Sequence, residues 1–193
     1  MTDATTLDLS TEADTTALGE RLARVARVGD VILLAGPIGA GKSHLARAFI
    51  RARLGPEEDV PSPTFTLVQV YDGPGEEIWH ADLYRLTHPD EVWELGLDDA
   101  FQRAICLVEW PDRLGAHVPN GALHLRLEAA GDGRRAHLSG GRPALAAAAG
   151  YGHFRACPTP SCAKRPPGCA FRARARCRPA SSTTSSRSAT GSR

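Results

Sequence analysis

Apolar and polar residues follow two periods along the first 140 positions, one typical of helices and one typical of strands. Leu18 and Leu22 belong to a run of apolar residues at helical spacing, and Ser10 or Thr11 offers an N-cap before them. The next segment, Val31–Ala35, is continuously apolar. Such a run predicts a strand that is buried on both faces.

The same reasoning assigns an element to most of the remaining segments. A turn signal at residues 72–75 lies between two strand-like runs and predicts a hairpin. The expected strands are residues 5–9, 31–35, 66–71, 77–82, 105–109, 123–128 and 135–138, and the expected helices are about residues 11–28, 42–54, 89–95 and 98–103. This alternation predicts an α/β domain over residues 1–140, with a mixed sheet flanked by helices.

Charge divides the chain at the same boundary. Residues 1–140 carry 13 Lys and Arg residues and all 22 Asp and Glu residues, a net charge of −9, whereas residues 141–193 carry ten basic residues and no acid. The second segment is rich in Arg, Ala, Pro and Ser and has no hydrophobic period, which predicts a disordered tail. Two explanations stay open: a frameshifted or unselected C-terminus, and a basic extension that binds RNA non-specifically.

Cysteine usage and hydropathy indicate the compartment. Cys106 lies in an apolar run and is expected to be a core residue of a reduced protein. The four remaining cysteines fall in the tail at spacings that do not match a zinc site. The sequence has neither a membrane-length apolar stretch nor the pattern of a signal peptide at its start. We therefore expect a cytoplasmic protein that does not associate with membranes.

The strongest chemical signal is a phosphate-binding loop. The sequence G-x-x-x-x-G-K-S lies between the predicted buried strand and the following helix, which is the context that this motif requires. The expected nucleotide-binding residues are Gly36, Pro37, Ile38, Gly39, Ala40, Gly41, Lys42 and Ser43. Backbone N–H groups and Lys42 would hold the phosphates, and the Ser43 hydroxyl would be a Mg²⁺ ligand. The fold class is then α/β of the P-loop NTPase-like kind.

A P-loop also needs a carboxylate on the metal side, usually at the end of a neighbouring strand. Two residues fit this requirement. Glu109 ends the apolar run that contains Cys106, and Asp82 ends the second strand of the hairpin. Either acid could bind the metal directly, and the other would then orient a water molecule. Sequence alone leaves this choice open.

Four motifs in order resemble the TsaE (YjeE) family of bacterial ATPases, which serves tRNA threonylcarbamoylation. The motifs are G-A-G-K-S at residues 39–43, S-P-T-F-T-L at residues 62–67, H-A-D-L-Y-R-L at residues 80–86 and V-E-W-P at residues 108–111. The resemblance covers about residues 8–139. It implies an ATPase with ATP and Mg²⁺ as cofactors, which works with the TsaD and TsaB proteins and meets tRNA indirectly through their complex.

The resemblance also implies roles for individual residues. Lys42 and Asp82 would act in catalysis, Thr64 and Thr66 would lie in a switch-like loop that senses the γ-phosphate, and Ser43, Glu109 and Asp82 would form the metal side. Arg134 resembles an arginine near the nucleotide base. The alternative function that we considered is a small-molecule or nucleotide kinase of the P-loop class, for which the short distance between Ser43 and the end of the domain leaves little room.

Overall fold

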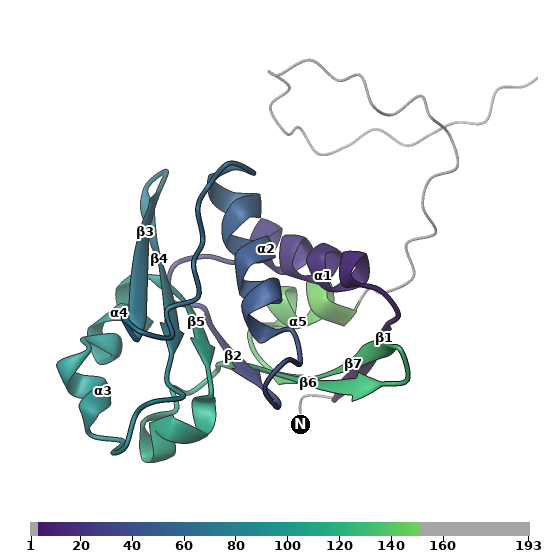
Figure 1. Ribbon diagram of the computed structural model, residues 1–193. Coiled ribbons are helices and arrows are strands. Elements are labelled where there is room, and N and C mark those ends of the chain that lie inside the picture. Colours follow the sequence, from purple (N-terminus) through teal and green to yellow (C-terminus); the bar gives the residue numbers. More distant parts are fainter. Residues whose placement is uncertain (1–3, 151–193) are drawn as a thin grey trace, which may run out of the picture. The chain divides into compact units, whose positions relative to one another are not determined.

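The computed structural model describes residues 4–150, which belong to the unit Met1–Phe154. The strands are β1 Thr5–Leu9, β2 Val31–Ala35, β3 Val68–Gly73, β4 Glu76–Asp82, β5 Ile105–Glu109, β6 Leu123–Ala130 and β7 Gly133–Gly140. The helices are α1 Glu12–Val25, α2 Lys42–Leu54, α3 Glu91–Glu94, α4 Leu97–Arg103, the 3₁₀ segment η1 Pro111–His117 and α5 Pro143–Gly150 (Figure 1).

The described strands form one seven-stranded mixed sheet in the order β1-β7-β6-β2-β5-β4-β3. The central strands β6, β2, β5 and β4 run parallel, while β7, β1 and β3 are antiparallel to their neighbours. Parallel strands bring their carboxyl ends to one edge of the sheet, and ligands bind at that edge in open α/β sheets. The α/β fold class with a mixed sheet and flanking helices is confirmed.

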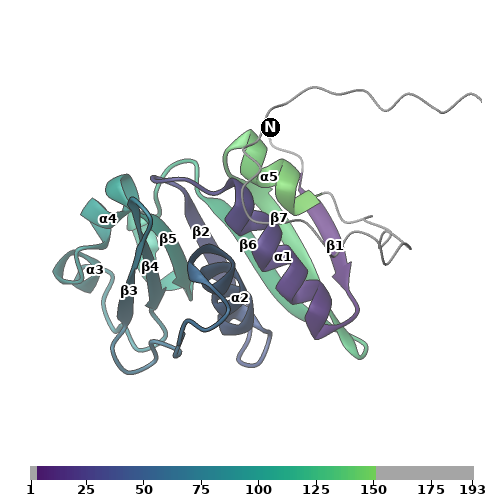
Figure 2. The same cartoon turned by 90° about the horizontal axis from the view of Figure 1, so that it is seen from above.

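Helices cover both faces of the sheet. Alternate residues of β2 point to opposite sides, so Ile32 and Leu34 enter the core beneath α1 and α2, while Val31 and Leu33 enter the core beneath α4. Figure 2 shows α1 and α2 side by side on one face and α3 and α4 near the β3–β4–β5 end. Because β2 is apolar on both faces, it forms the centre of the fold.

Local sequence signals explain the element ends. Thr11 caps α1 in a capping box: its side chain accepts the N–H of Asp14, whose carboxylate accepts the N–H of Thr11.

The expected hairpin also forms, but Gly73 pairs with Glu76, so the turn is shorter than predicted. The sheet strand β3 starts at Val68 rather than residue 66. Leu67 has φ +62° and donates its N–H to Pro63, which closes a turn before the strand.

The structure differs from the sequence prediction at the domain boundary. Residues beyond 140 were expected to lack structure, yet Pro143–Gly150 forms α5 against α1 and β1. Leu145 and Ala149 are buried in the main core, and the Arg142 guanidinium pairs with the buried Asp30 carboxylate. The sequence P-A-L-A-A-A-A-G carries a local helix signal, because proline stands at the first helical position and alanine is the strongest helix former, but the composition of the whole segment outweighed it in the prediction. The rest of the predicted disordered tail, residues 151–193, lies outside the described residues.

Two further sequence predictions concern burial and membranes. Cys106 is buried in β5, where desolvation raises the pKa of its thiol to about 12, as expected for a core residue. Within residues 4–150, none of the helices combines the length and the apolar character needed to cross a bilayer.

Candidate nucleotide-binding site

The predicted P-loop connects the central strand β2 to α2 at the carboxyl edge of the sheet. Its first residue, Gly36, has φ +135°, a conformation that favours glycine. A methyl group on Gly36 would lie 2.2 Å from the carbonyl oxygen of Leu127 in β6. The loop therefore leaves β2 in direct contact with the neighbouring strand, and only glycine fits at this position.

The first turn of α2 lacks the groups that usually satisfy a helix N-terminus. Gly41 is its N-cap and contributes no side-chain hydrogen bond, and the first turn contains no acid. In α1, by contrast, the side chains of Thr11 and Asp14 accept backbone N–H groups at the helix N-terminus. The free N–H groups and the positive end of the helix dipole consequently leave α2 suited to bind an anion.

Lys42 lies inside this loop and is 5% exposed. Its Nζ donates to the carbonyl oxygens of Gly36 and Pro37, each at 2.9 Å, and lies 4.0 Å from the centroid of the Trp110 ring. Burial lowers the pKa of the ammonium, and the carboxylates of Glu109 and Asp82 oppose that lowering. An ammonium has three donors, and two carbonyls leave it both a donor and a positive charge for a phosphate.

Glu109 ends β5 and links the P-loop helix to the sheet. The Ser43 hydroxyl donates to Oε2 of Glu109 at 3.0 Å, and His80 Nε2 lies 2.9 Å from Oε1. The Glu109 side chain is 2% exposed. The carboxylate is therefore fixed on both oxygens, and it lies directly beside the hydroxyl predicted to bind Mg²⁺.

Asp82 occupies the matching position at the end of β4. It is opposite Glu109 in the parallel β4–β5 register and is 6% exposed. Its carboxylate accepts the N–H of Tyr84 at 3.1 Å and the Thr64 hydroxyl at 3.4 Å. The two predicted acids thus lie at the same edge, but Glu109 contacts the P-loop helix whereas Asp82 contacts the loop before β3.

The loop before β3 contains both predicted threonines but places them in different surroundings. Thr64 reaches Asp82 and also lies 3.0 Å from the Ser62 hydroxyl. Thr66 is exposed, although the carbonyl of the next residue, Leu67, accepts the N–H of Asp82 at 2.8 Å. Phe65 between them is 87% exposed. The structure brings Thr64 to the acids and leaves Thr66 at the surface.

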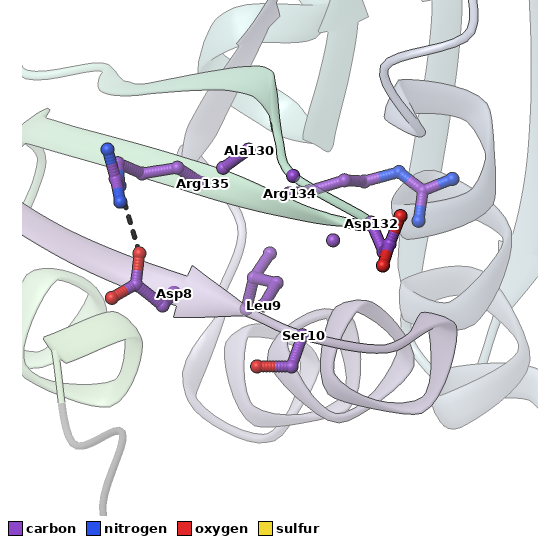
Figure 3. Close-up of a pocket in the computed structure, with 9 residues that line it drawn as sticks. Asp8, Leu9, Ser10, Ala130, Asp132, Arg134 and Arg135 are labelled. Atoms are coloured by element: carbon purple, nitrogen blue, oxygen red, sulfur yellow. Dashed lines mark hydrogen bonds and ion pairs between the residues drawn. The ribbon is translucent and has the colours of Figure 1, made fainter.

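Arg134 lies on the other side of the P-loop, at the start of β7. A methyl group on Gly41 would meet its Nε at 2.9 Å, so the guanidinium lies against the loop. The same residue lines an open cleft of about 600 Å³. Figure 3 shows Arg134 and Arg135 extending in opposite directions, and Arg135 pairs with Asp8. Arg134 also lies 3.9 Å from the Glu12 carboxylate, but of the two arginines it is the one against the P-loop, where a ligand could meet it.

The site offers a set of oxygen donors that fits Mg²⁺. The Ser43 hydroxyl and the Glu109 carboxylate are in contact, and Asp82 is adjacent. Among residues 4–150, the structure contains no group of three or more His, Cys, Asp or Glu side chains that could hold a metal by themselves. Magnesium is typically held by one or two carboxylates together with water and substrate phosphates. The donors present match that requirement.

Two residues have larger roles in the geometry than sequence reasoning assigned. Trp110 has φ +59°, and its ring packs against Tyr84 with centroids 4.9 Å apart while it faces Lys42. The imidazole of His80 contacts the carboxylate of Glu109 from the neighbouring strand β4. The sequence signals were available: His80 alternates with the acid of β4, and Trp110 directly follows the acid of β5.

Comparison with known proteins found a matching family and similar chains. The family model described as threonylcarbamoyl adenosine biosynthesis protein TsaE matches residues 9–137. The tRNA threonylcarbamoyladenosine biosynthesis protein TsaE of Rickettsia conorii is 35% identical over 127 residues, 66% of this chain and 73% of that protein. The corresponding protein of Bacillus subtilis is 37% identical over 123 residues, 63% of this chain and 76% of that protein.

A solved structure is also similar. The crystal structure of YdiB from Bacillus subtilis aligns with a TM-score of 0.61 at 25% identity, covering 77% of this chain and 93% of that one. The residues matched by the family model include the P-loop, both acids, the two threonines and Arg134.

Proposed function

Because the chain belongs to the TsaE family and is a tRNA threonylcarbamoyladenosine biosynthesis protein, we propose that it serves this pathway by binding and hydrolysing ATP with Mg²⁺. One observation carries the proposal: the Lys42 ammonium, the Ser43 hydroxyl and the Glu109 carboxylate meet at the carboxyl edge of the sheet. This combination is what a phosphate and a magnesium ion need together.

Each residue has a role that follows from its contacts. Lys42 and the free N–H groups of α2 bind the phosphates, and Ser43 with Glu109 holds the metal. Mg²⁺ bound there would neutralise charge on the β- and γ-phosphates. Asp82, supported by Thr64, acts next to the γ-phosphate by orienting the attacking water. Thr66 joins this group only if the loop before β3 rearranges on nucleotide binding.

Arg134 and the cleft that it lines suit the nucleoside end of the ligand. The guanidinium lies against Gly41, and the cleft opens beside it between β1 and the β6–β7 turn. A planar guanidinium stacks on aromatic rings and hydrogen-bonds to acceptors. We therefore assign the adenosine to this side of the P-loop.

The family membership supports an ATPase rather than the kinase alternative. We further propose that the protein acts in the cytoplasm with the TsaB and TsaD proteins, and that it meets tRNA only through their complex. The acidic character of residues 1–140 supports indirect contact, because a net charge of −9 repels a polyanion.

The test is ATP hydrolysis by the full chain, measured with and without the TsaB–TsaD complex. We expect Mg²⁺-dependent turnover that rises when the partners are added. Turnover that is unaffected by Mg²⁺ removal, or the transfer of phosphate to a small acceptor instead of water, would contradict the proposed function.

A further inference from the structure

His80 is a polar residue in the interior of β4. Strand alternation sets Ile78, His80 and Asp82 on one face, where Ile78 belongs to the core beneath α2 and Asp82 belongs to the site. His80 lies between them and is 1% exposed. A polar side chain at this depth costs free energy unless it is hydrogen-bonded.

The imidazole makes one hydrogen bond. Its Nε2 lies 2.9 Å from Oε1 of Glu109, and an ionised carboxylate can only accept, so Nε2 carries the proton. Nδ1 is buried and has no partner among the described residues. An apolar side chain would avoid this unpartnered nitrogen. The contribution of His80 to the molecule is therefore its bond to Glu109.

That hydrogen bond completes a network of side chains from α2, β5 and β4. Ser43 at the start of α2 donates to one oxygen of Glu109, and His80 in β4 donates to the other. Lys42 also attracts this carboxylate. Without a donor on Oε1, Glu109 would be free to turn toward the ammonium, which would remove it from Ser43 and neutralise the charge needed for phosphate.

We propose that His80 is a positioning residue that holds the Glu109 carboxylate beside Ser43 and thereby sets the affinity of the nucleotide site for Mg²⁺. This inference rests on the proposed function and extends it to a residue that touches neither nucleotide nor metal. Groups that orient the ligands of a metal typically change its affinity about 10–100-fold when they are replaced.

Two amide substitutions test whether the N–H donor at the Nε2 position is the part of the ring that matters. The side-chain nitrogen of glutamine reaches about as far as Nε2, whereas that of asparagine ends near Nδ1. His80→Gln should keep the Mg²⁺ concentration for half-maximal nucleotide binding within about threefold of the wild type. His80→Asn should raise it roughly 10–100-fold. Binding of a fluorescent ADP analogue is measured at increasing Mg²⁺ concentrations. In a control series with EDTA and no Mg²⁺, we expect the affinity for the analogue to be the same in the wild type and the variants.

A third variant, His80→Phe, lacks the donor but keeps an apolar ring, so the test does not depend on whether the asparagine variant folds. A folded asparagine or phenylalanine variant with the wild-type Mg²⁺ dependence would overturn the inference, as would a glutamine variant that behaves like asparagine. If the wild-type protein itself showed no Mg²⁺-dependent nucleotide binding, the proposed function would fail and the inference with it. Thermal melting of each variant separates loss of fold from loss of metal affinity.

Discussion

At the scale of single residues, the site depends on charges held close together in a dry environment. The ammonium of Lys42 is buried against Gly36, Pro37 and the ring of Trp110, and two carboxylates lie near it. Electrostatic interactions are stronger here than at the surface because little water screens them. Substitutions at these positions should consequently affect ligands far more than they affect the fold.

Lys42→Ala is expected to weaken ATP binding about 10–100-fold, because a hydrogen bond to a charged group contributes about 1.5–3 kcal/mol. Isothermal titration with ATP and Mg²⁺ measures this loss. The control is Arg24→Ala, which also removes one positive charge but from an exposed pair with Glu20. Equal affinities of the two variants would contradict the assignment of Lys42 to the phosphate site.

The same lysine predicts a pH dependence. Phosphate binding requires the charged ammonium, and burial lowers its pKa from the usual 10.5. Affinity should therefore be complete below this lowered pKa and decline as the pH rises through it, at a lower pH than for an exposed lysine. ATP affinity measured between pH 7 and 10 tests this, with Lys42→Arg as control because guanidinium stays charged. The same alkaline decline in both proteins would rule out Lys42 as the titrating group.

The two acids are expected to differ in what they control. Glu109 contacts Ser43, so Glu109→Gln should weaken Mg²⁺-dependent nucleotide binding. Asp82 contacts Thr64 and Tyr84, so Asp82→Asn should mainly slow hydrolysis and leave binding closer to normal. Nucleotide affinity and single-turnover hydrolysis are measured on both variants. If both substitutions left hydrolysis unchanged, neither acid would belong to the site.

At the scale of elements, the P-loop is shaped by the strand beside it. Gly36→Ala would bring a methyl group against the backbone of β6, which cannot move without disturbing its pairing with β2. Gly39→Ala is the matched control, because its φ is +78° but open space surrounds it. Denaturant unfolding should show a loss of about 3 kcal/mol or more for Gly36→Ala and about 1 kcal/mol for Gly39→Ala. Similar losses would mean that contact with β6 does not shape the loop.

Helix α5 provides a second test at this scale. A chain that ends after residue 140 loses the buried Leu145 and the guanidinium that pairs with Asp30. We expect a stability loss of about 3 kcal/mol or more, which corresponds to a fall in melting temperature of roughly 6–12 °C. A chain that ends after residue 150 keeps both contacts and should melt like the full chain. Identical melting of the two truncated proteins would show that α5 adds nothing to the fold.

At the scale of the whole molecule, the chain combines an acidic segment with a basic one. Residues 141–193 carry a net charge of +10, whereas residues 1–140 carry −9. If residues 151–193 act as a non-specific RNA-binding extension, a chain that ends after residue 150 should lose RNA binding and keep ATP hydrolysis. Filter binding at rising salt measures the first property, because phosphate contacts weaken steeply with ionic strength. RNA binding that survives this truncation would locate the RNA-binding surface in residues 1–150.

The elements and the phosphate-binding loop could be predicted because their signals are local. The capping box of α1 spans Thr11 and Asp14, the apolar run of β2 is contiguous, and the P-loop occupies eight consecutive positions. Helix α5 also has local signals, in its N-terminal proline and its run of alanines, but these do not specify where it packs. Its buried Leu145 and its salt bridge to Asp30 depend on elements more than a hundred residues earlier in the chain.

The amino-acid sequence by itself determined the α/β class, the existence of most helices and strands, and the residue types of the site, since neighbouring positions carry these signals. The tertiary structure alone decided which acid contacts Ser43, which threonine reaches Asp82 and which side chain His80 contacts. Ser43 and Glu109 are 66 positions apart, and they meet because β2, which leads into the P-loop, pairs in parallel with β5. Contacts of this kind depend on which distant strands pair, and parallel strands are joined by long crossover connections rather than by a local turn that would fix their register.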